Sequence, residues 1–299
     1  MLVFVLFGVS FGIRDVMYLS LGATQVKIGV IGNGIVGSAT ARSFIEHVDE
    51  VRVYDKVPTK RVNPLLETLA CDLVFICLPT PQDKPNLRCD TSILDEFFEA
   101  MREDYRETNF VLRSTVPIGY TKSIAEKYGF KSLIHSPEFL TARCAFTDAQ
   151  MPARNILGYV ANSMSYVLTD CEKQLQSLLK KRFPSVPIHK MTSDESESVK
   201  LMLNSFFAVK VSFFNEMYEL CRKLGLDWER VLNGILSDGR IAYSHTKVPG
   251  PDGKLGYGGT CLPKDIASLI DTFDKNALKS PVLLSSHIRN QYDRDTIND

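Results

Sequence analysis

A cysteine follows a glycine-rich stretch late in the chain, in the segment Gly258-Gly259-Thr260-Cys261-Leu262-Pro263-Lys264-Asp265. Glycines add little bulk, so the backbone here can approach a ligand closely and carry the thiol to it. The thiolate is the attacking form of cysteine, and a helix starting near Pro263 would place its positive N-terminal end beside Cys261. Cys261 is therefore a candidate covalent nucleophile. The alternative is a buried structural cysteine.

Lys200 and Asn204 stand four residues apart in a stretch with helical periodicity. Side chains four apart project from one face of a helix, so these two can converge on the same atom. A cation and an amide donor placed in this way suit the oxyanion of a tetrahedral intermediate. The alternative for Lys200 is a solvated lysine near a helix start.

Glu138 and Thr115 each come directly after a predicted strand, in Ser136-Pro137-Glu138-Phe139-Leu140 and Ser114-Thr115-Val116-Pro117. In open α/β sheets, ligands bind outside the carboxyl ends of the strands. Both residues are therefore candidates for a site at that edge. The alternatives are a surface carboxylate for Glu138 and a helix cap or turn residue for Thr115.

The segment Gly32-Asn33-Gly34-Ile35-Val36-Gly37 fits the pattern G-x-G-x-x-G, and Asp55 closes the next strand about 20 residues later. Such glycines let a pyrophosphate approach a helix N-terminus, where backbone N–H groups and the helix dipole favour negative charge. Asp55 would accept hydrogen bonds from ribose hydroxyls and repel the 2′-phosphate of NADP. We therefore expect NAD as the cofactor. The alternative is a glycine-rich turn that only helps the helix and the strand to pack.

The elements that must position these residues alternate between strand and helix. Strands are predicted over residues 26–31, 50–55, 71–79 and 109–115, with a helix carrying apolar residues from Ile93 to Met101 between the last two. Alternation of this kind indicates βαβ units, a parallel sheet and right-handed crossovers. The predicted fold class is α/β, with an N-terminal Rossmann-like doubly wound sheet.

The pattern changes after Thr192. Residues 194–236 hold no proline and show apolar residues at helical spacing, which predicts one long helix through Leu220 and a shorter one over 228–236. Residues 248–259 are rich in glycine and proline and must form a loop. We expect three parts: an N-terminal extension (1–25), an NAD-binding Rossmann-like domain (26–192), and an all-α central and dimerisation domain with the cysteine loop (193–299).

Composition narrows the class of protein. Lysine plus arginine and aspartate plus glutamate balance at 35 each in 299 residues, so the basic surface of a nucleic-acid-binding protein is not expected. The seven cysteines are scattered without metal-ligand spacing, which indicates reduced thiols, a cytoplasmic location and no metal site. The apolar run at residues 1–13 lacks preceding basic residues and is too short to span a bilayer. We expect it to be an extra strand or an arm packed on a partner subunit.

Several motifs occur together in a characteristic order: GNGIVG, CLPTP, STVPIG, SPEFL, K-x-x-x-N in a long helix, and GYGGTCLPKD. With them, the chain resembles the UDP-glucose/GDP-mannose dehydrogenase family over roughly residues 26–290. The resemblance implies two successive hydride transfers to NAD, which convert the C6 alcohol of a nucleotide sugar through an aldehyde to a carboxylate. UDP-glucose is the expected substrate, and a homodimer through the long helix is the expected assembly.

The resemblance also implies residue roles. Cys261 matches the nucleophile that forms a thioester, Lys200 and Asn204 match the oxyanion pair, Asp265 and Thr115 match the residues that hold water, and Glu138 matches the base. The matched motifs assign cofactor binding to Gly32, Gly34, Ile35, Val36, Gly37, Asp55, Pro79, Thr80, Thr115 and Lys264. They assign substrate binding to Glu138, Phe139, Leu140, Lys200, Asn204, Arg240, Tyr257 and Gly258, with Arg240 offered to a neighbouring subunit.

Two features depart from the family pattern. Members commonly show an acidic residue and a glycine after the SPEFL motif, where this chain has Thr141-Ala142-Arg143-Cys144. Members also usually continue through a further α/β domain, so we expect this chain to lack that domain. Two other functions stay open. One is a two-electron dehydrogenase of the hydroxyacid type with Lys200 as acid/base, and the other is an NAD-binding assembly module without turnover.

Overall fold

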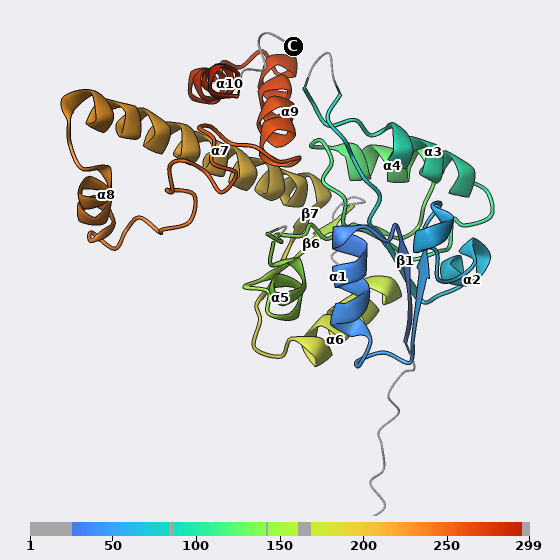
Figure 1. Cartoon of the computed structure of the whole chain (residues 1–299). Coiled ribbons are helices and arrows are strands. Elements are labelled where there is room, and N and C mark those ends of the chain that lie inside the picture. Colours follow the sequence, from blue (N-terminus) through green and yellow to red (C-terminus); the bar gives the residue numbers. More distant parts are fainter. Residues whose placement is uncertain (1–25, 84–86, 142, 161–168, 295–299) are drawn as a thin grey trace, which may run out of the picture.

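The computed structural model describes residues 26–83, 87–141, 143–160 and 169–294. The extension expected at residues 1–25 lies outside the described residues. Figure 1 shows a body built on a sheet and a helical part from which the long helix α7 reaches outward. The strands are β1 (Lys27–Ile31), β2 (Glu50–Tyr54), β3 (Leu73–Ile76), β4 (Phe110–Leu112), β5 (Leu133–His135), β6 (Asn155–Tyr159) and β7 (Ile188–Thr192).

Helices connect and follow these strands. They are α1 (Ile35–Phe44), α2 (Leu65–Leu69), α3 (Ser92–Met101), α4 (Tyr120–Tyr128), α5 (Ala145–Gln150), α6 (Asp170–Arg182), α7 (Ser193–Leu224), α8 (Trp228–Leu236), α9 (Leu262–Lys275) and α10 (Pro281–Asp293), with a short 3₁₀ helix at Pro58–Lys60. The predicted helices at 93–101 and 228–236 and the loop at 248–259 are confirmed.

The sheet has the strand order β2-β1-β3-β4-β5-β6-β7. Strands β1 to β5 run parallel, but β6 pairs antiparallel with β5, and β7 then runs parallel to β6. The parallel sheet expected from the strands over residues 26–115 is confirmed for β1 to β4, and the antiparallel β6 makes the whole sheet mixed. The physical reason is the connection between β5 and β6. Its described residues, 136–141 and 143–154, hold one short helix, α5, and the chain returns into the sheet at the end where β5 stops.

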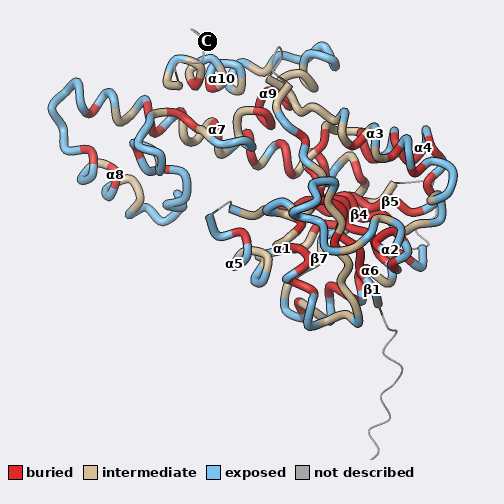
Figure 2. Tube along the Cα trace, turned by 45° about the vertical axis from the view of Figure 1, so that its right-hand side comes forward, coloured by how far each residue is buried: buried red, intermediate tan, exposed pale blue. Residues whose placement is uncertain are grey.

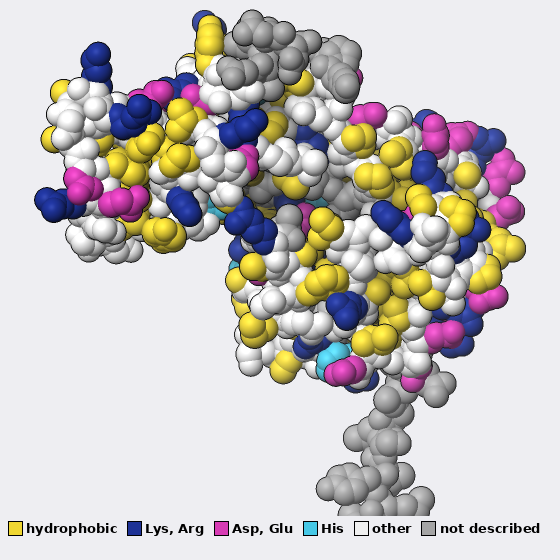
Figure 3. All heavy atoms as spheres, in the orientation of Figure 1, with side chains coloured by type: hydrophobic (Ala, Val, Ile, Leu, Met, Phe, Trp, Pro, Cys, Tyr) yellow, Lys and Arg dark blue, Asp and Glu magenta, His cyan; other side chains and the backbone are white. Residues whose placement is uncertain are grey.

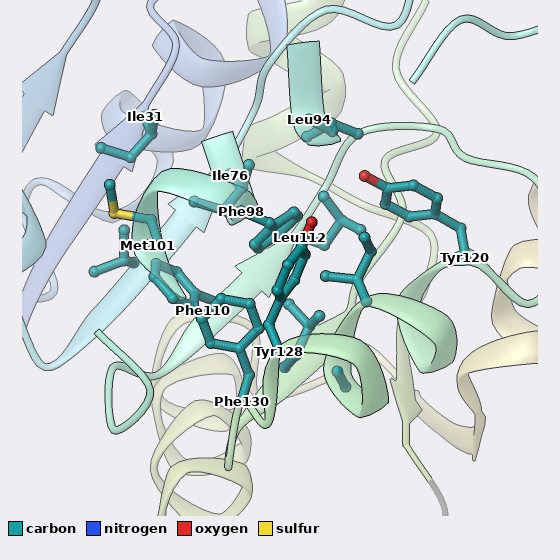
Figure 4. Close-up of a cluster of buried hydrophobic side chains, with 14 of the residues drawn as sticks. Ile31, Ile76, Leu94, Phe98, Met101, Phe110, Leu112, Tyr120, Tyr128 and Phe130 are labelled. Atoms are coloured by element: carbon teal, nitrogen blue, oxygen red, sulfur yellow. The ribbon is translucent and has the colours of Figure 1, made fainter. Parts of the chain in front are cut away.

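Side chains of the central strands alternate between two cores, as period-two geometry requires. Val74 and Ile76 of β3 face α3 and α4, whereas Leu73 and Phe75 face α1 and α6. Figure 4 shows the first core, where Phe98 lies against the rings of Phe110 and Phe130. In Figure 2 the strands form the buried centre of the body. The Rossmann-like part is confirmed as a sheet covered by helices on both faces.

The helix α7 links the sheet to the helical part. It begins with a capping box in which Thr192 Oγ1 accepts a hydrogen bond from the Glu195 amide and the Glu195 carboxylate accepts one from the Thr192 amide. It ends at Gly225, which takes the left-handed conformation of a C-terminal cap. Its first turns pack on β5 and β6, and later turns pack on α8, α9 and α10. None of the described helices is long and apolar enough to cross a membrane.

Candidate active site

The glycine-rich loop joins β1 to α1. A Cβ atom on Gly37 would lie 1.8 Å from the Gly32 carbonyl oxygen, so the loop and helix touch there. Beside Gly34, in contrast, nothing lies within 4 Å of the added atom. Gly34 is the N-cap of α1, and the first turn of this helix holds no acidic residue. The loop therefore leaves open space at a helix N-terminus that favours an anionic group.

Asp55 follows β2 and is tied to two loops. Its Oδ2 accepts a hydrogen bond from the Asn33 amide at 2.7 Å, and its Oδ1 accepts one from the Val57 amide at 2.8 Å. This places the carboxylate beside the glycine loop, as the motif spacing predicted. Each oxygen keeps a further lone pair that can accept a hydrogen bond from a ribose hydroxyl.

The ends of β3 and β4 lie side by side and are linked through Thr115. The Thr80 hydroxyl donates to the Thr115 carbonyl oxygen at 2.8 Å, and the Cys89 thiol donates to the same oxygen at 3.4 Å. Pro79, the predicted cofactor contact directly before Thr80, is exposed. Burial raises the pKa of the Cys89 thiol, so Cys89 serves here as a neutral donor.

Lys200 and Glu138 form a buried ion pair. Lys200 Nζ donates to Glu138 Oε1 at 3.0 Å and to the Glu138 carbonyl oxygen at 2.7 Å, and both residues are less than a tenth exposed. The other carboxylate oxygen accepts a hydrogen bond from the Leu140 amide at 2.6 Å. Lys200 also lies over the ring of Phe139, 5.5 Å from its centroid. The Glu138 segment is thereby held against α7.

Asn204 meets Asp265 one turn further along α7. The Asn204 amide donates to Asp265 Oδ2 at 2.6 Å, and Lys264 Nζ donates to Asp265 Oδ1 at 2.6 Å. Asp265 is fully buried. Burial opposes the charge of Lys264, but the neighbouring Asp265, through its charge and its hydrogen bond, helps to raise the pKa of Lys264. The predicted water-holding carboxylate is thus fixed between two predicted site residues.

Cys261 is exposed and caps the N-terminus of α9. Its carbonyl oxygen accepts the hydrogen bond of the Asp265 amide at 3.0 Å, which closes the first turn of the helix. The Thr260 hydroxyl oxygen Oγ1 lies 3.8 Å from its sulfur. The first turn of α9 therefore presents the thiol outward and the Asp265 carboxylate inward, towards Asn204.

The remaining predicted substrate residues differ in position. Tyr257 is buried among Ala208 and Ile266, so a contact with substrate would come from its backbone and not from its ring. Gly258, which follows it, is half-buried. Arg240 is exposed and bonds to Asp238 in its own turn, and no described contact joins it to the group around Lys200. The role of Arg240 stays a prediction.

A second buried cluster lies directly before Lys200, and the sequence analysis did not identify it. The Glu197 carboxylate accepts hydrogen bonds from the Gly119 amide at 2.6 Å, the Thr121 amide at 2.8 Å and the Thr121 hydroxyl at 2.5 Å. Burial raises the pKa of Glu197 to about 7. This carboxylate fastens the N-terminus of α4, which follows the Thr115 loop, to the helix that carries Lys200. The one available signal was its position three residues before Lys200.

A pocket of about 270 Å³ is lined in part by the segment that contains Glu138. Its walls come from α1, α6 and residues 136–156, and Arg113 contributes a guanidinium. Burial lowers the pKa of Arg113. Arg154 lies over the ring of Phe139 at 4.2 Å and closes one side. Glu138, Phe139 and Leu140 thus line this pocket and also belong to the segment that contacts Lys200.

Comparison with protein families gives two adjoining matches. Residues 61–176 match the NAD binding domain of the UDP-glucose/GDP-mannose dehydrogenase family, and residues 194–292 match the central domain of the same family. The two matches cover well over half of the chain. The first supports NAD as the cofactor, as the glycine loop and Asp55 predicted.

Among curated relatives, a UDP-glucose 6-dehydrogenase of Campylobacter jejuni is 34% identical over 251 residues, covering 83% of this chain and 59% of the relative. A second, from Bacillus subtilis, is 30% identical over 284 residues, covering 82% of this chain and 61% of the relative. The chain therefore spans about three fifths of the length of these relatives.

Among solved structures, a UDP-glucose dehydrogenase from Pyrobaculum islandicum superimposes with a TM-score of 0.76 at 24% identity, covering 91% of this chain and 69% of that chain. The 3-hydroxyisobutyrate dehydrogenase of Mycobacterium tuberculosis gives a TM-score of 0.70 at 18% identity, covering 91% of this chain and 94% of that chain. Both likenesses concern the fold.

Proposed function

Since the chain belongs to the UDP-glucose/GDP-mannose dehydrogenase family, we propose that it is an NAD-dependent nucleotide-sugar 6-dehydrogenase, with UDP-glucose as substrate and UDP-glucuronate as product. The observation that carries this proposal is the junction of α7 and α9. There Asn204 donates a hydrogen bond to Asp265, which lies four residues after the exposed Cys261. Lys200, on the same helix as Asn204, donates to Glu138. The set supplies a nucleophile, oxyanion donors and two carboxylates.

The glycine loop fits the cofactor. Gly34 leaves room for a pyrophosphate at the N-terminus of α1, and the carboxylate of Asp55 lies beside the loop where a ribose would lie. NAD, when bound, would accept one hydride, so the two oxidations would use two NAD molecules in succession. Pro79, Thr80 and Thr115, which follow β3 and β4, would bind and orient the cofactor together with the buried ammonium of Lys264.

The chain's own groups account for the remaining steps. Cys261 Sγ adds to the aldehyde carbon and forms a thiohemiacetal, and loss of a hydride from that carbon leaves a thioester. Lys200 and Asn204 donate to the oxygen that carries negative charge in these adducts. A water held by Asp265 and Thr115 attacks the thioester carbonyl, Glu138 accepts its proton, and the Cys261 thiolate leaves. A sulfur is required because the intermediate of this route is a thioester.

The substrate and stoichiometry are tested in one assay. NADH formation is followed with UDP-glucose, UDP-N-acetylmannosamine and GDP-mannose, and the expected result is two NADH per molecule of UDP-glucose. One NADH per substrate would favour the hydroxyacid-type alternative, in which Lys200 is the acid/base. No NADH with any of the three sugars would reject the proposal.

The covalent step is tested by Cys261→Ser. A serine alkoxide is far less accessible at neutral pH, so acid formation should fall by roughly 1,000-fold or more. Cys144→Ser is the matched control, because Cys144 is the other exposed cysteine of the described chain. Acid formation at the wild-type rate in Cys261→Ser would exclude the thioester.

We infer a homodimer formed through α7. Intramolecular partners cover part of this helix, since Phe214 packs on Trp228 and Phe207 stacks on His245. A stripe of apolar side chains stays exposed at helical spacing, and Figure 3 shows apolar groups gathered along the arm that α7 and α8 form. The stripe consists of Met202, Phe206, Phe213, Leu220 and Leu224. Pairing two such helices would bury it and bring Arg240 towards the partner.

Light scattering at micromolar concentration tests this assembly. Phe213→Glu should give a monomer, because it puts a charge in the centre of the stripe. Phe146→Glu is the control, since Phe146 is similarly exposed but lies on α5. A wild-type protein that is monomeric and fully active would reject both the interface and the shared role of Arg240.

A further inference from the structure

The loop before Cys261 has little regular structure, so something else must hold it. Residues 248–259 contain no helix or strand, and Gly253, Gly256 and Gly259 take left-handed conformations. Such a chain loses considerable conformational entropy when it is fixed. The position of a nucleophile that follows such a loop is therefore only as well defined as the position of the loop.

Two buried asparagines accept hydrogen bonds from consecutive backbone amides of this loop. Asn215 Oδ1, on α7, accepts from the Gly256 amide at 3.1 Å. Asn290 Oδ1, on α10, accepts from the Tyr257 amide at 2.6 Å. Asn215 is 2% exposed and Asn290 is 8% exposed. Because a buried amide group is costly to leave unpaired, these bonds fix the loop strongly.

The contact is close enough to require glycine. A Cβ atom on Gly256 would lie 2.5 Å from Asn290 Oδ1, and one on Gly258 would lie 2.8 Å from Arg294 Nη1. Arg294 also donates to the Gly256 carbonyl oxygen at 2.8 Å and to Asp252 at 2.5 Å. The loop is therefore held at both the amide and the carbonyl of Gly256.

The same loop is wedged between the helices that carry the site. The ring of Tyr257 packs against Ala208 on α7 and Ile266 on α9, and its hydroxyl donates to the Ser286 carbonyl oxygen on α10 at 3.3 Å. Asn215 stands on α7, the helix of Lys200 and Asn204. The loop is thus held in a fixed position relative to the helix that carries the oxyanion donors.

We propose that Asn215 and Asn290 are positioning residues that fasten the Gly256–Tyr257 backbone to α7 and α10 and thereby set the place of Cys261 relative to Lys200 and Asn204. The catalytic part of this inference rests on the proposed function. It predicts a selective defect. The oxidation of alcohol to aldehyde does not need the thiol, whereas the oxidation of aldehyde to acid does.

The test uses Asn290→Leu, which removes the acceptor at similar size, and Asn290→Asp, which keeps an acceptor oxygen. Hydrogen–deuterium exchange of the peptide over residues 254–263 should rise at least tenfold in Asn290→Leu and much less in Asn290→Asp. With UDP-glucose, NADH per sugar should fall from two towards one in Asn290→Leu, with free aldehyde trapped by hydroxylamine. Asn290→Asp should restore most acid formation.

Two further variants keep the test decisive. Arg294→Met, which loosens the same loop without removing a buried amide's partner, serves if Asn290→Leu does not fold. Phe98→Leu, in the core between β4 and α3, is the control for a general loss of stability, and its NADH per sugar should stay at two. Wild-type stoichiometry in a loop variant with raised exchange would overturn the proposal, and so would unchanged exchange.

A wild-type protein that oxidises no nucleotide sugar would reject the proposed function. The role of Asn215 and Asn290 in holding the loop would then be judged by a separate readout. Hydrogen–deuterium exchange of residues 254–263 is that readout, and unchanged exchange in Asn290→Leu would overturn the proposal in that case.

Discussion

Replacing Glu197 with glutamine should change how the stability of the fold depends on pH. The Glu197 side chain is fully buried, and burial raises its pKa from the ordinary 4.5 to about 7, against three hydrogen bonds from Gly119 and Thr121 that lower it. The negative charge of Asp194 raises it slightly further. The folded state therefore binds this proton more tightly than the unfolded state does.

The sign and size follow from linkage. A raised carboxyl pKa contributes stability that is complete below about pH 4.5 and is lost as the pH rises to about 7. One pKa unit corresponds to about 1.4 kcal/mol, so the contribution is roughly 3 kcal/mol. Glutamine does not titrate and lacks it. The wild-type unfolding free energy minus that of Glu197→Gln should therefore fall by roughly 3 kcal/mol as the pH rises.

The comparison must be made as this difference, because His135 acts in the opposite direction. Burial lowers the pKa of His135 from 6.5 to about 3. The contribution of this neutral side chain to the stability of the fold is therefore lost as the pH falls below about 6.5. The two groups partly cancel in the wild-type curve. Both proteins contain His135, so its contribution drops out of the difference.

Urea unfolding followed by circular dichroism at pH 5, 6, 7 and 8 gives the four differences. Glu126→Gln, on the exposed surface of α4, is the control for removal of a carboxylate. A difference that stays flat, or that grows with pH, would show that the hydrogen bonds and not burial decide the protonation of Glu197.

Two further variants test the ion pair and the cofactor site. Lys200→Met should lower the unfolding free energy by about 3–5 kcal/mol, because it leaves the buried Glu138 carboxylate unpaired; the double variant with Glu138→Gln should recover part of the loss in thermal denaturation, and no recovery would contradict the pairing. Asp55→Ser should lower the preference for NAD over NADP by about tenfold or more, because the carboxylate that repels the 2′-phosphate is removed. Arg61, which donates to the Asp55 carbonyl oxygen at 3.0 Å, then faces the 2′-phosphate without that carboxylate. Dissociation constants from NADH and NADPH fluorescence measure the ratio, and an unchanged ratio would exclude Asp55 as its cause.

The sequence predicted the elements that have strong periodic or glycine signals. The glycine loop, the long helix and the loop before Cys261 stand where the pattern placed them, and Lys200 and Asn204 do share one face of α7. These features depend on neighbours within a few residues. The local pattern therefore sufficed for them.

Features that depend on distant contacts were not predictable in this way. Glu197 stands in the run Ser-Asp-Glu-Ser-Glu-Ser, which looks like a solvated charged surface, and only its contact with Gly119 and Thr121 makes it a buried acceptor. Asn290 has no local signal at all. The direction of β6 was also missed, because periodicity does not show whether the chain crosses the sheet before a strand.

The junction of β7 and α7 has no intervening residue. Thr192 is the last residue of β7 and also the N-cap of α7. One residue inserted here would turn the whole helix by about 100° about its axis. Lys200 and Asn204 would then point away from Glu138 and Asp265, although neither would have been changed. The rotation of α7 about its axis, and with it the direction of Lys200 and Asn204, is therefore fixed at a single peptide step.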